Sequence, residues 1–380
     1  MPQIRIPAAW MRGGTSKGVF FLASDLPAEP AERDALLARL LGSPDPYGKQ
    51  IDGLGGATSS TSKVVIVAPS QQPDCDVDYW FGQVLVDSGR LDWSGNCGNL
   101  TAAVGPFALW RALLPAPGDG EVNVRLWQAN VGKRIHARVP VQDGRPLEAG
   151  KFLLDGVAFA SAPVTLTFLD PGAAAGGGIL PTGNAVDTLT LDDGTRIDAS
   201  LVSAGNPMVF VAARTLGLDA TAAQATLNAD AALRARCEQI RIAGALTMGL
   251  ADSAAAAAAR QHTPKVAVVA PPADCVSVDG KRFAAAELDL LTRVLSMGAF
   301  HHAIPGTAAI AIAAAAGVPG SLVSRQLQHD PVGPLRIGHP SGRSEVGATM
   351  HTNSGHWVLE AAVLRRSARL LMDGWACLPG

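Results

Sequence analysis

The segment Asn96-Cys97-Gly98-Asn99 places a thiol just before an alanine-rich stretch, which we expect to form a helix over residues 100–113. The first turn of a helix leaves backbone N–H groups unpaired, and with the helix dipole these donors bind carboxylates. A thiol there is favoured as the thiolate and can act as acid, base or nucleophile. We predict a catalytic Cys97, with Asn96, Gly98 and Asn99 as substrate-binding residues. An ordinary buried cysteine beside a tight turn is the alternative.

Lys63 stands at the start of an apolar run, directly after the hydroxyl side chains of residues 58–62. A lysine that is desolvated there, beside Lys17 or Arg12, has a pKa below its free value of about 10.4. Such an amine works as a general base. We therefore predict Lys63 as the base and Ser62 as a substrate-binding residue. A strand-end lysine that reaches solvent is the alternative.

Residues 12–18, Arg-Gly-Gly-Thr-Ser-Lys-Gly, form a glycine-rich turn with cations and hydroxyls. The turn matches neither the phosphate-binding pattern GxxxxGK[ST] nor the dinucleotide fingerprint GxGxxG. As a hairpin it needs no function, whereas a carboxylate clamp needs Arg12 or Ser16 to point inward. We predict Arg12, Ser16 and Lys17 as substrate-binding residues.

Two adjacent histidines, His301 and His302, raise the question of a metal site. Neighbouring residues on a helix or strand point apart, and the sequence has no third ligand at a useful spacing. We therefore predict no metal site. His302 is predicted instead as a substrate contact, close to Gly306 and Thr307.

Three segments of the chain recur in the same order. Residues 19–26 match 209–216, residues 61–69 match 263–271 with six of nine positions identical, and residues 98–103 match 306–311. This indicates a tandem duplication. It pairs Lys63 with Lys265, which we predict to bind substrate together with Gly306 and Thr307. Pro305 precedes Gly306 where the first copy has Cys97, so a two-thiol racemase is excluded and Lys63 must supply the other proton-handling group.

The remaining pattern predicts an α+β fold, because many short strands surround few helices. We expect strands near 18–22, 64–68, 83–87, 122–128, 133–139, 164–169, 209–213, 266–269, 336–338, 345–350 and 357–365. Helices are expected near 30–41, 100–113, 231–242, 284–296 and 307–316. The glycine-rich stretch 170–178 is the expected linker. It separates half-domains 1–177 and 178–380, with the active site in the cleft between them. Whether the C-terminal strand crosses over to the first half is left open.

Composition narrows the classes of partner. The formal net charge of −2 and the scattered Lys and Arg residues predict no nucleic-acid partner. The apolar run 308–318 is too short for a membrane span, and the N-terminus lacks a signal peptide, so we expect no membrane partner. Five widely spaced cysteines fit reduced thiols in the cytoplasm. The expected partner is a small polycarboxylate, and a homodimer is left open.

Several motifs together resemble the PrpF family. They are MRGGTSKGVFF, GSPDPYGKQIDGLGGATSSTSK, DWSGNCGNLTAAVGPFAL, QANVGK, RQHTPK, HHAIPGTAAIAI and GHPSG. The resemblance implies a diaminopimelate epimerase-like fold of two pseudo-symmetric halves, each a sheet wrapped around a central helix. It implies 2-methylaconitate cis-trans isomerase activity in propionate breakdown by the methylcitrate cycle, without a cofactor. It also implies Lys63 as base and Cys97 as its partner. Pro305 departs from the epimerase pattern, which has a second cysteine there.

The hypothesis that follows is an allylic proton shift, or an isomerisation through the same dienolate, with Lys63 removing a proton from a CH2 next to a carboxylate. The N–H groups of Gly98 and Gly306 would hold the charge, helped by Ser16, Thr307 and Lys265. A 4-oxalomesaconate tautomerase, acting on another unsaturated tricarboxylate, is the first alternative. The second is a non-catalytic accessory protein of an iron-sulfur 2-methylcitrate dehydratase.

Overall fold

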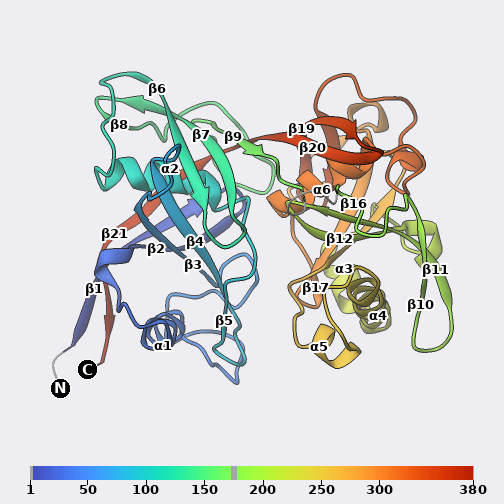
Figure 1. The fold of residues 1–380 in the computed structure, drawn as a ribbon, viewed down its shortest axis with the longest axis horizontal. Coiled ribbons are helices and arrows are strands. Elements are labelled where there is room, and N and C mark those ends of the chain that lie inside the picture. The colour runs from blue at the N-terminus through green and yellow to red at the C-terminus, as the bar shows by residue number, and fades with distance from the viewer. Residues whose placement is uncertain (1–2, 173–177, 380) are drawn as a thin grey trace. The chain divides into compact units, whose positions relative to one another are not determined.

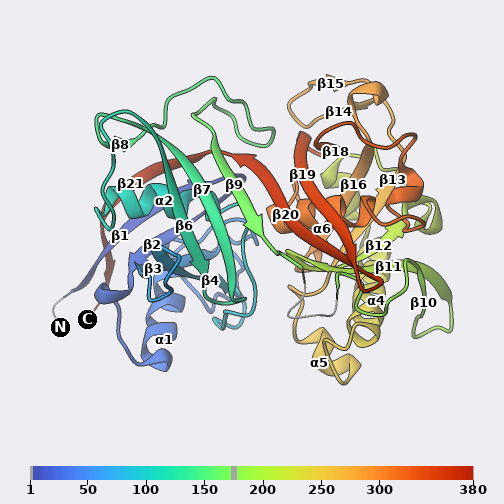
Figure 2. The ribbon, with the colours of Figure 1, turned by 45° about the horizontal axis from the view of Figure 1, so that its top comes forward.

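The computed structural model describes residues 3–172 and 178–379, and the chain divides into two compact units. The first unit is Met1–Leu169 with Arg365–Gly380, and the second is Asp170–Leu364. Figures 1 and 2 show the strands of the first unit in blue to green, with the red strand β21 beside the blue strand β1. In the described part of the chain, every helix is too short or too polar to cross a membrane.

The boundary between the units differs from the predicted one at 177/178. The second unit already begins at Asp170, and residues 365–380 belong to the first unit. The crossover of the C-terminal strand, which the sequence leaves open, is due to β21 (Ala368–Leu378). This strand pairs antiparallel with β1 (Ile4–Gly13) from Ile4↔Leu378 to Gly13↔Ala368. Of the expected linker 170–178, residues 173–177 lie outside the described residues.

The first unit is a sheet in the order β21-β1-β2-β3-β4-β6-β7-β9. Besides β1 and β21, its strands are β2 (Ser16–Leu22), β3 (Lys63–Pro69), β4 (Val77–Val84), β6 (Gly120–Gln128), β7 (Lys133–Gln142) and β9 (Val164–Leu169), with short β5 (Leu91–Asp92) and β8 (Arg145–Pro146). The pairs β2/β3 and β4/β6 are parallel, and the others are antiparallel. Its helices are α1 (Pro30–Leu41) and α2 (Thr101–Trp110), with the 3-10 turn η1 (Ala23–Asp25).

The second unit repeats this pattern in the order β10-β11-β12-β13-β16-β18-β19-β20. The strands are β10 (Asp187–Thr190), β11 (Arg196–Ala204), β12 (Asn206–Ala212), β13 (Lys265–Ala270), β16 (Leu290–Ser296), β18 (Leu335–His339), β19 (Gly342–Asn353) and β20 (His356–Arg366), with short β14 (Cys275–Val276), β15 (Arg282–Phe283) and β17 (Ala299–Phe300). Its helices are α3 (Gln224–Ala229), α4 (Ala231–Thr247), α5 (Ala254–Ala258) and α6 (Gly306–Ala316), with 3-10 turns η2 (Ala213–Leu216), η3 (Ala285–Glu287) and η4 (Ser324–Gln326).

The two sheets share one pairing pattern, as the sequence duplication predicts. The parallel pair β12/β13 corresponds to β2/β3, the antiparallel pair β13/β16 to β3/β4, and the parallel pair β16/β18 to β4/β6. The matched sequence segments fall on β2 and β12, β3 and β13, and the starts of α2 and α6. The expectation of two pseudo-symmetric halves is confirmed.

Each unit buries one helix almost completely. Residues 101–109 of α2 and 306–315 of α6 are all buried, and neither helix contains a charged side chain. A helix that is apolar on every side belongs inside a core. Helix α2 contacts β1, β6, β7, β9 and β21, which makes it the central helix around which the sheet wraps.

The two faces of β2 and β3 have different neighbours, and this decides where Lys63 points. Helix α1 packs Leu37, Leu40 and Leu41 in one cluster with Val64 and Ile66. Side chains alternate along a strand, so Lys63 lies on the opposite face. Phe20 of β2 belongs to that face, because its ring contacts the ring of Phe107 in α2 at 5.5 Å.

The helix expected over residues 284–296 is wrong. The structure has the 3-10 turn η3 followed by the strand β16. All seven residues of β16 are buried, and the strand pairs with β13 and β18. The pairing partners lie far away in sequence, and they outweigh the helical preference of the alanines and leucines.

Candidate functional site

Lys63 is a buried lysine with a neutral partner. Its side chain is 7% exposed, and Nζ donates a hydrogen bond of 2.6 Å to Oε1 of Gln83, which is itself buried. The amine also lies 4.7 Å from the centre of the Phe81 ring. Gln83 and Phe81 are two residues apart on β4, so they share the face that Lys63 meets.

Burial lowers the pKa of the Lys63 amine, and the negative charge of the Cys97 thiolate acts in the opposite direction. Desolvation disfavours the ammonium form because water is the better solvent for its charge. The predicted desolvation is therefore the main cause of the lowered pKa, and the predicted neighbours Lys17 and Arg12 make no contribution.

Cys97 is half-buried in the turn that leads into α2. The backbone N–H of Leu100 points at its Sγ at 3.5 Å, and the hydroxyl of Ser16 lies 4.0 Å from Sγ. Helix α2 begins at Thr101, whose N–H and hydroxyl both bind the carbonyl oxygen of Cys97 at 3.0 Å. The thiol therefore lies at the start of the central helix, beside a backbone N–H donor and the Ser16 hydroxyl.

The glycine-rich turn is a hairpin of β1 and β2, and its side chains divide between two faces. Residues directly opposite in a sheet share a face, and Arg12 is opposite Lys17 while Gly13 is opposite Ser16. Ser16 is buried and faces Cys97. Arg12 and Lys17 therefore lie on the other face.

The contacts of the two cations agree with this division. Lys17 places Nζ 4.8 Å from the centre of the Trp10 ring. Arg12 donates to Gly14 and Ser367 at 3.1 Å and to Ser161 at 3.2 Å, and burial lowers its pKa. Ser16 lies on the side of Cys97, as an inward-facing clamp requires, whereas strand alternation places Arg12 and Lys17 on the other face. The substrate contacts of Arg12 and Lys17 stay predictions.

The glycines of the hairpin allow it to pack against the neighbouring site segments. A Cβ at Gly18 would lie 2.7 Å from the carbonyl oxygen of Lys63, and one at Gly13 would lie 2.6 Å from that of Asn99. Gly14 has a φ of +52° and would place a Cβ 2.5 Å from the Asn99 amide oxygen. Side chains at these places would force the hairpin away from both Lys63 and the cysteine turn.

Asn96 and Asn99 hold the cysteine turn in place. The amide oxygen of Asn96 accepts from the Tyr79 hydroxyl at 3.1 Å and from Thr101 at 3.4 Å. Asn99 donates to the Thr15 hydroxyl at 2.9 Å and accepts from Arg366 at 3.1 Å. Gly98 between them is buried. The Asn99 amide thus contacts protein groups at both of its ends, and its contribution in this structure is to fix the turn.

Ser62 and the long loop before it form a second support. Ser62 is buried and donates to Gln50 Oε1 at 2.7 Å, and Gln50 in turn donates to Ser43 at 2.8 Å. This connects the residue before Lys63 with the loop between α1 and β3. The hydroxyl of Ser62 therefore points toward Gln50.

The sequence analysis missed Gln83, Phe81 and Arg366. Gln83 and Phe81 become neighbours of Lys63 only through the register of β3 with β4. Arg366 is buried, and burial lowers its pKa to about 10. The sequence signal for Gln83 was a polar residue inside an apolar strand. Arg366 had no such signal, because its role depends on a contact with the distant Asn99.

In the second unit, Lys265 begins β13 as Lys63 begins β3. Its Nζ donates to the carbonyl oxygen of His262 at 2.8 Å. Gly306 is the first residue of α6, Thr307 is buried, and Pro305 gives the helix no side-chain cap. These residues have the strand-and-helix arrangement of their counterparts in the first unit.

His301 and His302 differ from the expectation that they point apart. Their rings stack, with centroids 4.6 Å apart, because the segment between β17 and α6 is neither helix nor strand. Burial lowers the pKa of His302. Among the described residues, no group of three His, Cys, Asp or Glu side chains is placed to hold a metal ion.

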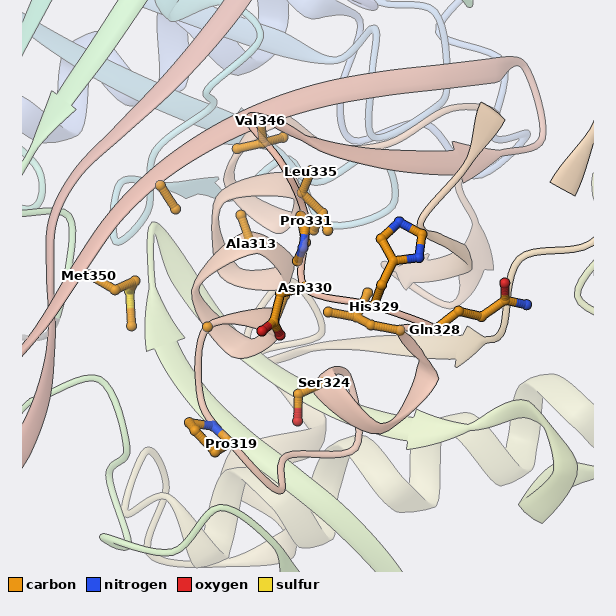
Figure 3. A pocket seen from close by; sticks show the side chains of 15 residues that line it. Ala313, Pro319, Ser324, Gln328, His329, Asp330, Pro331, Leu335, Val346 and Met350 are labelled. Carbon is orange, nitrogen blue, oxygen red and sulfur yellow. The ribbon is translucent and has the colours of Figure 1, made fainter. Parts of the chain in front are cut away.

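A pocket of about 720 Å³ in the second unit contains none of the predicted site residues. It is lined by the C-terminal part of α6, by β19 and by the loop that carries His329 and Asp330 (Figure 3). Gly306 and Thr307 begin α6 at its opposite end. This pocket is therefore separate from the residues predicted to do chemistry.

Known proteins similar to this chain are isomerases. It is 52% identical to 2-methyl-aconitate isomerase of Cupriavidus necator and 51% identical to that of Shewanella oneidensis, in each case over 100% of this chain and 98% of the relative. It is 39% identical to 4-oxalomesaconate tautomerase of Pseudomonas putida, over 100% of this chain and 97% of that protein.

Solved structures support the fold. A crystal structure of methylitaconate-delta-isomerase matches with a TM-score of 0.79 at 38% identity, covering 100% of this chain and 96% of the other. A hydroxyproline epimerase from Agrobacterium vitis matches with a TM-score of 0.57 at 13% identity, over 99% and 93% of the two chains, which shows the fold alone. The family model described as PrpF protein matches residues 3–379. The chain belongs to the PrpF family.

Proposed function

We propose that this isomerase converts 2-methylaconitate between its cis and trans forms, with Lys63 as the base. Relatives that carry this activity in their names are 52% and 51% identical to the chain, against 39% for the oxalomesaconate enzyme. The observation that carries the proposal is the buried Lys63 amine, which is hydrogen-bonded to the neutral amide of Gln83.

The reaction needs a proton to leave carbon. The substrate carries a CH2 group that lies between a carboxylate and the C=C bond. Removal of a proton from this CH2 leaves a dienolate whose negative charge is delocalised through the C=C bond. A neutral amine accepts the proton and becomes an ammonium. Burial favours the neutral amine of Lys63, so more of the enzyme is ready to react at neutral pH.

The dienolate explains how the geometry changes. Its former C=C bond has partial single-bond character, so rotation about this bond becomes possible. The Cys97 thiol then gives a proton to the same carbon and the C=C bond re-forms. Transfer of the proton from the Lys63 ammonium to the thiolate restores the starting state of the enzyme. The hydroxyl of Ser16 and the backbone N–H of Gly98 would stabilise the negative charge of the dienolate.

Cys97 is proposed as the second proton-handling group. Its Sγ lies beside the Ser16 hydroxyl and the Leu100 N–H, so both charge states of the sulfur have a polar neighbour. Gly98, Lys265, His302, Gly306 and Thr307 remain predicted substrate contacts. The whole sequence of steps moves protons and no net electrons, so the proposal requires no cofactor.

The decisive experiment is an assay of the purified protein on trans-2-methylaconitate, without any dehydratase present. Turnover in deuterated water should place deuterium in the substrate, and Lys63→Ala should lower the rates of both isomerisation and exchange by about 10²–10⁴-fold. Isomerisation at full rate by Lys63→Ala would contradict the proposal. No turnover with the wild-type protein would support the accessory-protein alternative.

The tautomerase alternative uses the same residues. A substrate comparison under identical conditions separates the two, and we expect kcat/KM to be higher for 2-methylaconitate than for 4-oxalomesaconate. The reverse order would reassign the enzyme within the family.

The biological setting is part of the same proposal. We place the enzyme in the cytoplasm, in propionate breakdown through the methylcitrate cycle, supported by the family resemblance and by its five free cysteines. A deletion strain should fail to grow on propionate and recover with the wild-type gene, but not with Lys63→Ala. Recovery with that variant would contradict this placement.

A further inference from the structure

Gln83 lies directly opposite Lys63 in the antiparallel register of β3 and β4. Cross-strand neighbours on one face are held close together by the sheet itself. The hydrogen bond from Lys63 Nζ to Gln83 Oε1 is 2.6 Å long, and both residues are buried. The backbone of the sheet therefore fixes the direction in which the amine points.

The orientation of the Gln83 amide is fixed as well. Its Nε2 donates to the carbonyl oxygen of Ser62 at 2.9 Å. A carbonyl oxygen accepts only, so the NH2 end must face Ser62 and the oxygen end must face Lys63. Gln83 thus offers the amine an acceptor, and a neutral Lys63 that donates one N–H to it keeps its lone pair for another direction.

The neighbours of the Lys63 amine on β4, Phe81 and Gln83, are uncharged. Among the described residues, the titratable group that acts on the Lys63 pKa is Cys97 in the turn before α2, and it raises this pKa. A carboxylate in place of the Gln83 amide would stabilise the ammonium form and retain the proton. The amide accepts the hydrogen bond without adding a negative charge.

The second unit provides a natural comparison. Val266 is opposite Leu295 in the antiparallel β13/β16 pair, so Ser296 is the residue opposite Lys265. Ser296 has a short hydroxyl where β4 has the long amide of Gln83, and Lys265 donates to the His262 carbonyl. Of the two matched lysines, only the proposed base, Lys63, lies opposite a glutamine.

We propose that Gln83 is a positioning residue for the reaction: it aims the Lys63 amine and, being neutral, leaves that amine free to accept a proton. The inference rests on the proposed role of Lys63 as the base. It assigns no contact between Gln83 and the substrate.

The test uses the full-length protein and three variants. Gln83→Glu keeps an acceptor oxygen but adds a charge, and Gln83→Leu removes the acceptor. Gln326→Glu is the matched control, because Gln326 is a buried glutamine of the second unit that contacts Leu322. The Lys63 titration is followed without substrate by NMR of protein labelled with 13C at the lysine Cε, and Lys63→Ala assigns the signal. The pH profile of kcat is measured in parallel.

Gln83→Glu should raise the Lys63 titration midpoint by about one pH unit or more and move the rising limb of kcat upward by the same amount, with most of the rate regained at high pH. Gln83→Leu should lower kcat at every pH, and Gln326→Glu should leave the Lys63 midpoint unchanged. An unchanged midpoint in Gln83→Glu would overturn the inference, as would a normal kcat in Gln83→Leu. The NMR titration needs no substrate, so it tests Gln83 even if the wild-type protein does not turn over 2-methylaconitate.

Discussion

Lys63 and Lys265 occupy matched places in two copies of one fold, yet their surroundings differ. Both begin a strand that runs parallel to one neighbour and antiparallel to another. Lys63 is buried against Gln83 and Phe81, whereas Lys265 is half-buried and binds a backbone carbonyl. The comparison teaches that the duplicated strands preserve the position of a lysine, while the side chains on the next strand decide its chemistry.

The largest expected effect comes from removing each lysine in turn. Lys63→Ala should lower kcat by about 10²–10⁴-fold, the usual contribution of a positioned base. Lys265→Ala should act mainly on KM, since it is predicted to bind a carboxylate. Steady-state kinetics on both variants measures the split, and circular dichroism checks that both fold. Equal losses of kcat would remove the distinction between the two lysines.

The cysteine of the first unit has no thiol counterpart at Pro305 of the second. Cys97→Ser should lower kcat by about 10²-fold, because a hydroxyl releases a proton far less readily than a thiol. Cys237→Ser is the control, since Cys237 is buried in the hydrophobic core of the second unit and burial raises its pKa to about 12. A Cys97→Ser enzyme as active as this control would assign Cys97 a lining role only.

The pH dependence should follow Lys63 because its pKa is lowered. Below that pKa the amine is protonated and cannot accept a proton, so kcat should rise by about tenfold per pH unit and then level off. Because burial is the main cause of the shift, the plateau should begin below the pKa of an ordinary lysine. A rise that continues up to the ordinary lysine value would mean that the active amine is well solvated.

A smaller effect, on stability, is expected from a substitution at Gly18, whose counterpart in the second unit is a methionine. Met208 is the residue beside Lys265 in the β12/β13 register. Gly18→Ala would bring a methyl group against Lys63 and Leu100, so it should lower the free energy of unfolding by about 1–3 kcal/mol. Urea unfolding measures this, with Gly374→Ala as control because a Cβ there meets open space. Equal stability of the two variants would contradict the proposed close packing.

The sequence was sufficient to predict features whose signals are local. The segments 61–69 and 263–271, which contain Lys63 and Lys265, and the small-residue segments of α2 and α6 appear as matched motifs. The duplication and the central helices could therefore be predicted. Gln83 was missed because it meets Lys63 only through a register that no local pattern specifies. The alanine-rich start of residues 284–296 favoured a helix, but pairing with β13 and β18 makes a strand.

The same distinction applies to the hairpin of β1 and β2. The composition of residues 12–18 correctly indicated a turn that carries cations, but the side chains that face the site depend on strand alternation. Arg366 could not be connected with Asn99 from the sequence, because the contact joins residues 267 positions apart.

The pairing of β21 with β1 has a consequence for how the protein is made. Ser367 accepts from Gly14 and Arg12, and Arg366 holds Asn99, so the turn around Cys97 is braced by residues that the ribosome adds some 350 positions after the hairpin. A nascent chain that ends at residue 364 therefore has its second unit complete while the first still lacks an edge strand. Catalytic competence must arise late in synthesis, although its key groups are among the first to be translated.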